Sequence, residues 1–115
     1  MSDRPSDILL EDIMEACEKI FSYTQELDFD EFSHNGMVRD AVERNLEIIG
    51  EAVNKLTPEA KSAQPHINWV KIVGLRNRLI HGYFAVDKPM LWNTIKVVLP
   101  PFYQNILKIA QTRRE

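Results

Sequence analysis

The chain has 115 residues, of which 44% are hydrophobic and only four are glycine. This length and composition predict one ordered, helix-rich domain spanning residues 1–115 and argue against a disordered chain. The net charge of −3, with histidine counted as neutral, argues against broad coating of nucleic acid but leaves room for a small, locally basic site.

The chain contains a single cysteine, Cys17, which excludes an internal disulfide and indicates a reducing compartment. Residues 1–5 are polar and lack the apolar segment of a signal peptide, and the apolar runs are far shorter than a bilayer-spanning helix. We therefore expect a cytoplasmic protein with no membrane association.

Two long helices are predicted in the first half of the chain. Apolar residues recur with helical spacing from about Ser6, a plausible cap, to Leu27, and again from about Asn35 to Lys55. Between them, residues 28–33 alternate acidic residues with Phe29 and Phe32, and we expect a connection with both rings turned inward.

The second half contains a short helical turn and two further helical segments. Thr57 is the expected cap of the short turn, with Pro58 at its first position. A third helix is predicted from about residue 68 to 80, and a fourth begins after the cap Asp87. Pro100-Pro101 is expected to break or kink the fourth helix before the pattern resumes. The predicted fold class is all-α, a four- to five-helix up-down bundle with short links.

An acidic ladder, Glu43-Glu47-Glu51, lies on the polar side of the second helix. One interpretation is a solvated face. The other is that part of the ladder meets a basic group such as Arg76 or Arg78 across a helix–helix contact, because an unpaired buried charge is costly. The sequence leaves both interpretations open.

The residues best suited to chemistry lie together in one stretch, residues 74–84. Arg76, Asn77, Arg78, His81 and Tyr83 place two guanidiniums, a carboxamide, an imidazole and a phenol within eight positions. Asn77 and His81 share a face of a straight helix, whereas Arg76 and His81 lie about 140° apart around the axis. Because Gly82 follows His81, we expect a site at the carboxyl end of this helix, onto which Tyr83 could fold back.

Other kinds of site find little support. The sequence has no glycine-rich phosphate loop, and the three histidines and the one cysteine are scattered, so we expect no cofactor and no metal. Arginine binds phosphate bidentately, histidine transfers protons near neutral pH, and asparagine can orient either one. This set suits RNA cleavage without a metal, with a two-fold dimer supplying a second histidine. The alternative is that His81 merely caps a helix end.

The stretch resembles the Arg, four residues, His signature of the HEPN superfamily, and residues 76–83 match the form of the HepT toxins, in which a tyrosine follows the histidine by two residues. Residues 44–52 resemble the second helix of that family, and Leu99-Pro100-Pro101 resembles its late helix. The resemblance thus rests on three separated segments in the expected order.

The resemblance implies a homodimer that acts as the toxin of a type VII-like toxin–antitoxin pair by metal-independent RNA cleavage. In this chain Arg76 would hold the scissile phosphate, His81 would be general acid or base, and Asn77 would support both. The antitoxin implied is an MntA-type minimal nucleotidyltransferase, which would silence the toxin by transferring AMP from ATP onto Tyr83.

A second hypothesis is a non-catalytic helical module that pairs with the nucleotidyltransferase and presents a substrate or nucleotide to it. The acidic net charge is compatible with this alternative. Under both hypotheses a dimer is expected, because large apolar residues of the late helices, including Trp92, Phe102 and Tyr103, exceed what one small core needs.

Overall fold

The computed structural model describes residues 5–62, 64–81 and 87–114, with the backbone alone at positions 79–81 and 113–114. The described residues form helices and no strand, as the sequence predicted. In chain order the elements are α1 (Ser6–Thr24), α2 (Phe29–Ser33), α3 (Gly36–Lys55), α4 (Pro58–Ser62), α5 (Trp69–His81), α6 (Lys88–Asn93), the π-helical turn η1 (Thr94–Val98) and α7 (Leu99–Arg114).

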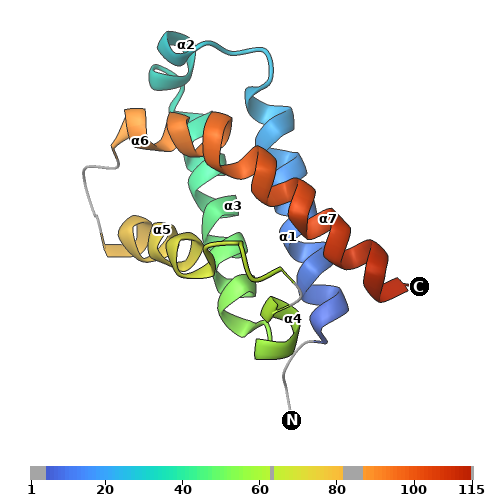
Figure 1. Ribbon diagram of the computed structural model, residues 1–115. Helices are drawn as coiled ribbons and strands as arrows, with labels where there is room; N and C mark the ends of the chain where they lie inside the picture. The colour runs from blue at the N-terminus through green and yellow to red at the C-terminus, as the bar shows by residue number, and fades with distance from the viewer. Residues whose placement is uncertain (1–4, 63, 82–86, 115) are drawn as a thin grey trace.

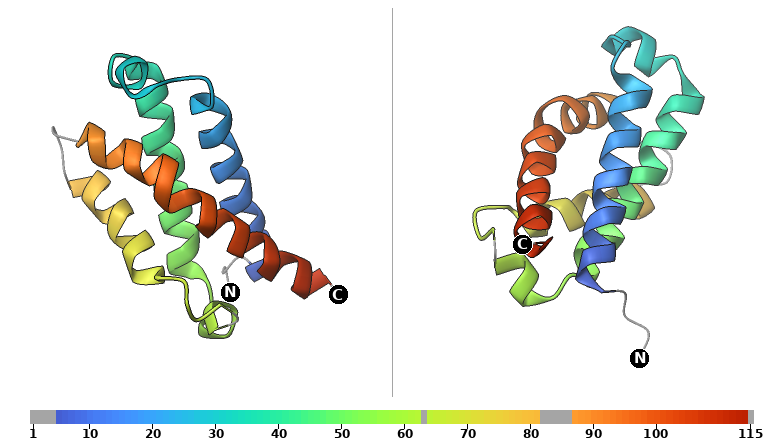
Figure 2. Two further views of the ribbon diagram at one scale, coloured as in Figure 1. Left: turned by 45° about the horizontal axis from the view of Figure 1, so that its top comes forward. Right: turned by 90° about the vertical axis from the view of Figure 1, so that its right-hand side faces the viewer.

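Four long segments build the bundle. Helices α1 and α3 lie side by side and run in opposite directions, and the continuous segment α6–η1–α7 crosses them (Figures 1 and 2). Helix α5 packs against α3, while the short helices α2 and α4 lie in the connections at opposite ends of the bundle (Figure 1). None of the described helices is long and apolar enough to cross a bilayer.

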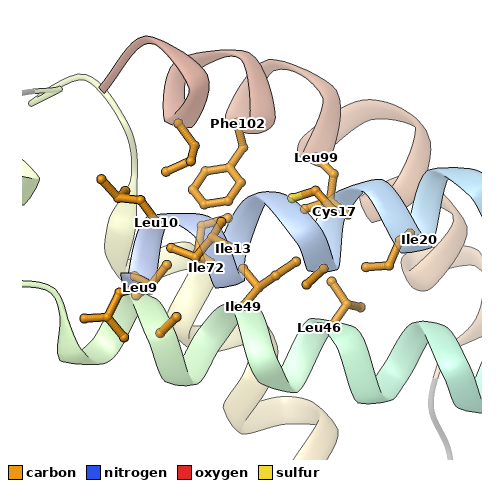
Figure 3. Close-up of a cluster of buried hydrophobic side chains, with 14 of the residues drawn as sticks. Leu9, Leu10, Ile13, Cys17, Ile20, Leu46, Ile49, Ile72, Leu99 and Phe102 are labelled. Carbon is orange, nitrogen blue, oxygen red and sulfur yellow. The ribbon is translucent and has the colours of Figure 1, made fainter. Parts of the chain in front are cut away.

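The core forms where the apolar stripes of these helices meet. Ile13 and Cys17 of α1 lie in this core together with Leu46 and Ile49 of α3, and α7 covers the core from one side (Figure 3). All four of these side chains are at most 4% exposed. The helical periodicity of the sequence therefore predicts the buried faces well, because a stripe of this kind is stable only when another helix covers it.

Local capping explains most of the helix starts. Asn35 accepts a hydrogen bond from the Val38 N–H at 3.1 Å, Thr57 from the Ala60 N–H at 3.2 Å, and Asp87 from the Met90 N–H at 3.1 Å. The expected cap at Ser6 is wrong: α1 already includes Ser6, and the Pro5 carbonyl accepts from the Ile8 and Leu9 N–H groups. Helix α1 also ends at Thr24, three residues before the predicted end at Leu27.

The connection after α1 is more ordered than expected. Asp28 and Glu31 form a reciprocal capping box, with hydrogen bonds of 2.8 and 2.9 Å, that starts α2. Phe32 is fully buried, but Phe29 stays 39% exposed, so only one of the two rings is turned fully inward. Both rings nevertheless contact Trp92, at centroid distances of 5.1 Å from Phe32 and 6.2 Å from Phe29.

Pro100 and Pro101 neither break the helix nor end it. They fall in the first turn of α7, directly after η1, where the Leu99 N–H bonds to the Thr94 carbonyl five residues back. Two consecutive prolines cannot donate to the carbonyls of the preceding turn, and the wider π-helical turn accommodates that loss. The predicted break therefore does not occur, and the helix is widened locally at η1, directly before the two prolines.

Candidate active site

The centre of the candidate site is the close approach of α5 to α3 (Figure 1). Gly50 of α3 is buried beneath the side chain of Arg76 of α5. A Cβ atom at Gly50 would lie 2.8 Å from Cγ and 3.3 Å from Cδ of Arg76, and closer still to its Cβ. Only glycine leaves room here for the aliphatic part of the Arg76 side chain. Gly50 therefore allows α5 to pack closely against α3 at this point.

Arg76 is held by two oxygen acceptors. Its Nη2 group forms an ion pair with Oε1 of Glu51, and its Nη1 group donates to Oδ1 of Asn77 at 3.0 Å. The Arg76 side chain is 26% exposed and that of Glu51 is 47% exposed. The guanidinium is thus fixed at the edge of the helix–helix contact and still faces solvent in part.

The third part of the guanidinium has no acceptor. The Nε atom of Arg76 is buried and has no hydrogen-bond partner among the described residues. A buried donor left without an acceptor is unfavourable. The packing at Gly50 and the bonds to Glu51 and Asn77 therefore hold Arg76 in a conformation that its own hydrogen bonding only partly satisfies.

The acidic ladder divides into three different environments. Glu51 pairs with Arg76 across the helices, which is the second of the two interpretations left open by the sequence. Glu47 lies 3.8 Å from Arg44 on the same helix. Burial raises the pKa of Glu43, and the nearby charge of Asp40 adds to that shift. The ladder is therefore neither a uniform solvated face nor a shared binding surface.

The structure describes some of the predicted site residues and not others. It brings Arg76 and Asn77 together, as the expected support of the arginine by the carboxamide requires. Arg78 is exposed. Helix α5 ends at His81, one turn after Asn77 and on the same face by helical register. The predicted positions Gly82 and Tyr83 lie outside the described residues.

A pocket that the sequence did not predict adjoins Asn77. It has a volume of about 290 Å³ and is lined by Asn54 of α3, Lys61 of α4, and Trp69, Val70, Val73, Gly74 and Asn77 of α5. We call it the α5 pocket. Asn54 and Lys61 lie far from the motif in the sequence, so only the fold could connect them with it. The one available signal was Gly74, a glycine inside an otherwise helical pattern.

Within the described part of the chain, no group of three or more His, Cys, Asp or Glu residues is arranged to hold a metal ion. The polar groups that meet where α5 lies against α3 are the guanidinium of Arg76, the carboxamide of Asn77 and the carboxylate of Glu51. The guanidinium and the carboxamide can donate hydrogen bonds to an anion, while the carboxylate holds the guanidinium in place.

Comparison with known proteins identifies the class to which this fold and site belong. Residues 13–109 match the family model described as "Ribonuclease HepT-like", so the chain belongs to the HepT-like ribonuclease family. This result confirms the resemblance seen in the motif.

Individual relatives extend the match over nearly the whole chain. "Putative RNase MJ1380" of Methanocaldococcus jannaschii is 39% identical over 106 residues, which are 92% of this chain and 97% of the relative. "Probable ribonuclease HepT" of Thermococcus cleftensis is 43% identical over 91 residues, which are 79% of this chain and 83% of the relative. No solved structure gives a significant match.

Proposed function

We propose that this protein is a metal-independent endoribonuclease whose site lies at the carboxyl end of α5. Family membership supports a ribonuclease activity. The observation that carries the proposal further is the arrangement of Arg76: it is held half-buried against α3 and is bonded to Asn77, which lies one turn before position 81. A guanidinium fixed by its neighbours, on the same helix as a histidine, is suited to phosphodiester chemistry once both reach one phosphate.

In this mechanism Arg76 holds the scissile phosphate and stabilises the charge that develops on its oxygens. A histidine takes the proton of the 2′-hydroxyl, whose oxygen attacks the phosphorus. The bond to the 5′-oxygen breaks, and an acid returns a proton to that leaving oxygen. His81 takes one of these roles, and in a homodimer His81 of the second chain takes the other. Asn77 orients Arg76.

The proposed biological setting is a type VII-like toxin–antitoxin pair in the cytoplasm. The antitoxin is an MntA-type minimal nucleotidyltransferase that joins the phenol oxygen of Tyr83 to the α-phosphorus of ATP, with pyrophosphate leaving and the phenol proton passing to a base. Because Tyr83 follows the end of α5 by two residues, the added phosphate would compete with RNA for Arg76. This modification is our proposed off switch.

The proposal is tested by assaying RNA cleavage in the presence of EDTA. The protein is purified to homogeneity, and its measured mass must show that it carries no modification. We expect the parent to cleave and to leave cyclic phosphate ends, and His81→Ala and Arg76→Ala each to lose about 10²-fold or more in activity. Arg78→Ala is the matched control, because it removes an exposed arginine two positions from Arg76. Activity of His81→Ala equal to that of the parent would overturn the assignment.

The same preparations test the off switch. Incubation with the nucleotidyltransferase and ATP should add the mass of AMP to the parent and abolish cleavage. The Tyr83→Phe variant should gain no mass and should stay active. If Tyr83→Phe gained AMP to the same extent as the parent, the proposed site of modification would be wrong.

The second candidate function is a non-catalytic module that binds the nucleotidyltransferase and presents nucleotide or substrate. The pairing of Arg76 with Glu51 favours it, because that carboxylate already occupies part of the guanidinium. Both candidates predict the same partner, so catalysis separates them. If the parent failed to cleave total RNA, the binding module would be the better proposal.

A further inference from the structure

The two glycines near the contact between α3 and α5 differ in the space around them. Gly50 has no room for a side chain, whereas a Cβ atom at Gly74 would meet no heavy atom within 4 Å. Glycine is a poor helix former, yet nothing in the described packing requires it at position 74. Gly74 lines the α5 pocket, so its effect is to leave the backbone of α5 bare on one wall.

Polar groups from three helices converge on this pocket. The side chains of Asn54 and Asn77 are exposed, and Lys61 is half-buried. Among the described residues, neither the Asn54 carboxamide nor the Lys61 ammonium has a side-chain partner. Because Oδ1 of Asn77 accepts from Arg76, its amide N–H groups are the part left to bind a ligand. The pocket thus offers two carboxamides and one cation.

The remaining walls are apolar and partly held in place. The indole Nε1–H of Trp69 donates to the Lys61 carbonyl at 3.2 Å, and its ring meets Phe102 edge-on at a centroid distance of 6.1 Å. Val70 is 82% exposed. A volume of about 290 Å³ is at the lower end of the range for small-molecule pockets, which suits one flat ring rather than a larger ligand.

Helical register connects the pocket with the proposed catalytic position. Positions 70, 74, 77 and 81 follow one face of α5, so the pocket and the end of the helix lie on a single stripe. Arg76 lies about 140° around the axis from position 81 and reaches this stripe through its side chain, which donates to Asn77. Gly74 and position 81 are separated by roughly 10 Å along the axis. A strand of RNA whose phosphate lay at the end of α5 could therefore place a neighbouring base in the pocket.

We propose that the α5 pocket binds one unpaired base of the RNA, next to the phosphate that is cleaved, and thereby sets the sequence preference of the enzyme. This inference rests on the proposed ribonuclease function. Carboxamides recognise base edges by paired hydrogen bonds, apolar walls receive the flat faces, and unstacked bases of single strands are the usual targets of sequence-specific recognition. The Lys61 ammonium suits an adjacent phosphate.

The experiment compares cleavage sites on an RNA library that is randomised on both sides of a single-stranded segment. Asn54→Ala removes one base-edge contact, and Gly74→Leu fills the pocket from a position with open space. We expect each variant to reduce the discrimination at one flanking position by about fivefold to about 150-fold, the range for one paired contact to a base.

Matched controls come from a second groove, between the start of α5 and α7. Asn105 and Val97 line that groove and not the α5 pocket. Asn105→Ala removes a carboxamide as Asn54→Ala does, and Val97→Leu places a leucine at an exposed position of that groove; both should keep the parent's preference. A parent that cleaves every sequence equally well, or pocket variants that keep its preference, would overturn the proposal.

Two further outcomes would have a different meaning: a parent that does not cleave RNA, and a pocket variant that changes the oligomeric state. If the parent does not cleave, the proposed function fails, and the pocket is tested by fluorescence anisotropy with a short 2′-O-methyl RNA. Equal affinity of the parent and Gly74→Leu then overturns the inference. If Gly74→Leu alters the sedimentation coefficient while Asn54→Ala leaves base preference intact, this face is a contact between subunits and not a base pocket.

Discussion

At the scale of single residues, Arg76 is held by contacts along the whole length of its side chain. Its stem is accommodated by Gly50, its Nη groups bond to Glu51 and Asn77, and its Nε atom is buried without a partner among the described residues. An arginine held at several points loses less conformational freedom when it binds phosphate. In the mechanism that we propose, Glu51 is accordingly a positioning residue, and its carboxylate offsets part of the positive charge of Arg76.

Replacing Glu51 tests this role. In Glu51→Ala the guanidinium loses an acceptor, so we expect kcat to fall about tenfold or more, since small displacements of a catalytic group are costly. We also expect the free energy of unfolding to fall by about 1 kcal/mol, a value reduced for solvent screening because Glu51 is 47% exposed. Glu51→Gln keeps an acceptor and should restore most of kcat.

Steady-state kinetics and urea denaturation measure both effects. Glu47→Ala is the control, because Glu47 is one turn away on the same helix and pairs with Arg44 instead. If Glu51→Ala matched the parent in kcat, or if Glu51→Gln were as impaired as Glu51→Ala, Glu51 would not position Arg76 through its acceptor oxygens.

At the scale of elements, the two glycines inside helices show that helix packing and helix propensity act independently on stability. The crossing of α5 over α3 depends on the absence of a side chain at Gly50, whereas Gly74 lies in the middle of α5 against open space. The same chemical change at the two positions therefore has opposite consequences.

Gly50→Ala should lower the free energy of unfolding by about 1–3 kcal/mol, because the new methyl group forces α3 and α5 apart. Gly74→Ala should raise it by about 0.5–1 kcal/mol, because alanine is the better helix former and meets no neighbour. Urea denaturation of both variants beside the parent measures the difference. Changes of the same sign would show that the close contact at Gly50 does not control the packing of these helices.

Helix starts were more predictable than the geometry inside and between helices. The predicted caps at Thr57 and Asp87 follow from residues a few positions apart, and both are confirmed, while Asn35, predicted only as an approximate helix start, is also a cap. The outcome at Pro100-Pro101 depended on whether the lost hydrogen bonds broke the helix or widened it. The buried neighbours Ile95 and Leu99 keep the segment against the core, so it continues through η1 into α7.

At the scale of the whole molecule, the fold holds two acidic protons, one on Cys17 of α1 and one on Tyr103 of α7. Burial raises the pKa of the Cys17 thiol to about 12, and the charge of Glu18 adds to the effect. The Tyr103 hydroxyl donates to Oε2 of Glu18 at 2.6 Å, and this hydrogen bond is the main cause that raises the pKa of Tyr103 to about 12. Both groups are therefore held in their neutral forms by the folded state.

These pKa values predict a loss of stability in alkali. The ordinary values are 9.0 for the thiol and 10.0 for the phenol, so above about pH 9 the folded chain binds more protons than the unfolded chain. The contribution is fully present below those ordinary values and is lost as the pH rises through about 12. Urea unfolding should give a lower midpoint at pH 11 than at pH 8.

Tyr103→Phe separates the two groups. This variant lacks the phenol proton and should show a smaller decrease in the midpoint between pH 8 and pH 11 than the parent. A decrease as large as that of the parent would show that the hydrogen bond from Tyr103 to Glu18 contributes nothing to the alkaline transition.

The sequence by itself determined the helical class, most helix starts, the buried stripes and the motif around Arg76 and Asn77. Periodicity, caps and motif spacing are properties of residues close together in the chain, so they can be read without the fold. The motif also identified the family that the comparisons confirm.

Only the tertiary structure decided which acid of the ladder meets Arg76, why Gly50 is required, and that Asn54 and Lys61 share a pocket with Asn77. Glu51 and Arg76 are 25 positions apart, and three glutamates at helical spacing looked equivalent until one lay opposite the arginine. Contacts between helices depend on the angle at which the helices cross and on the volume of every side chain between them. Neither quantity can be read from residues that are close together in the chain.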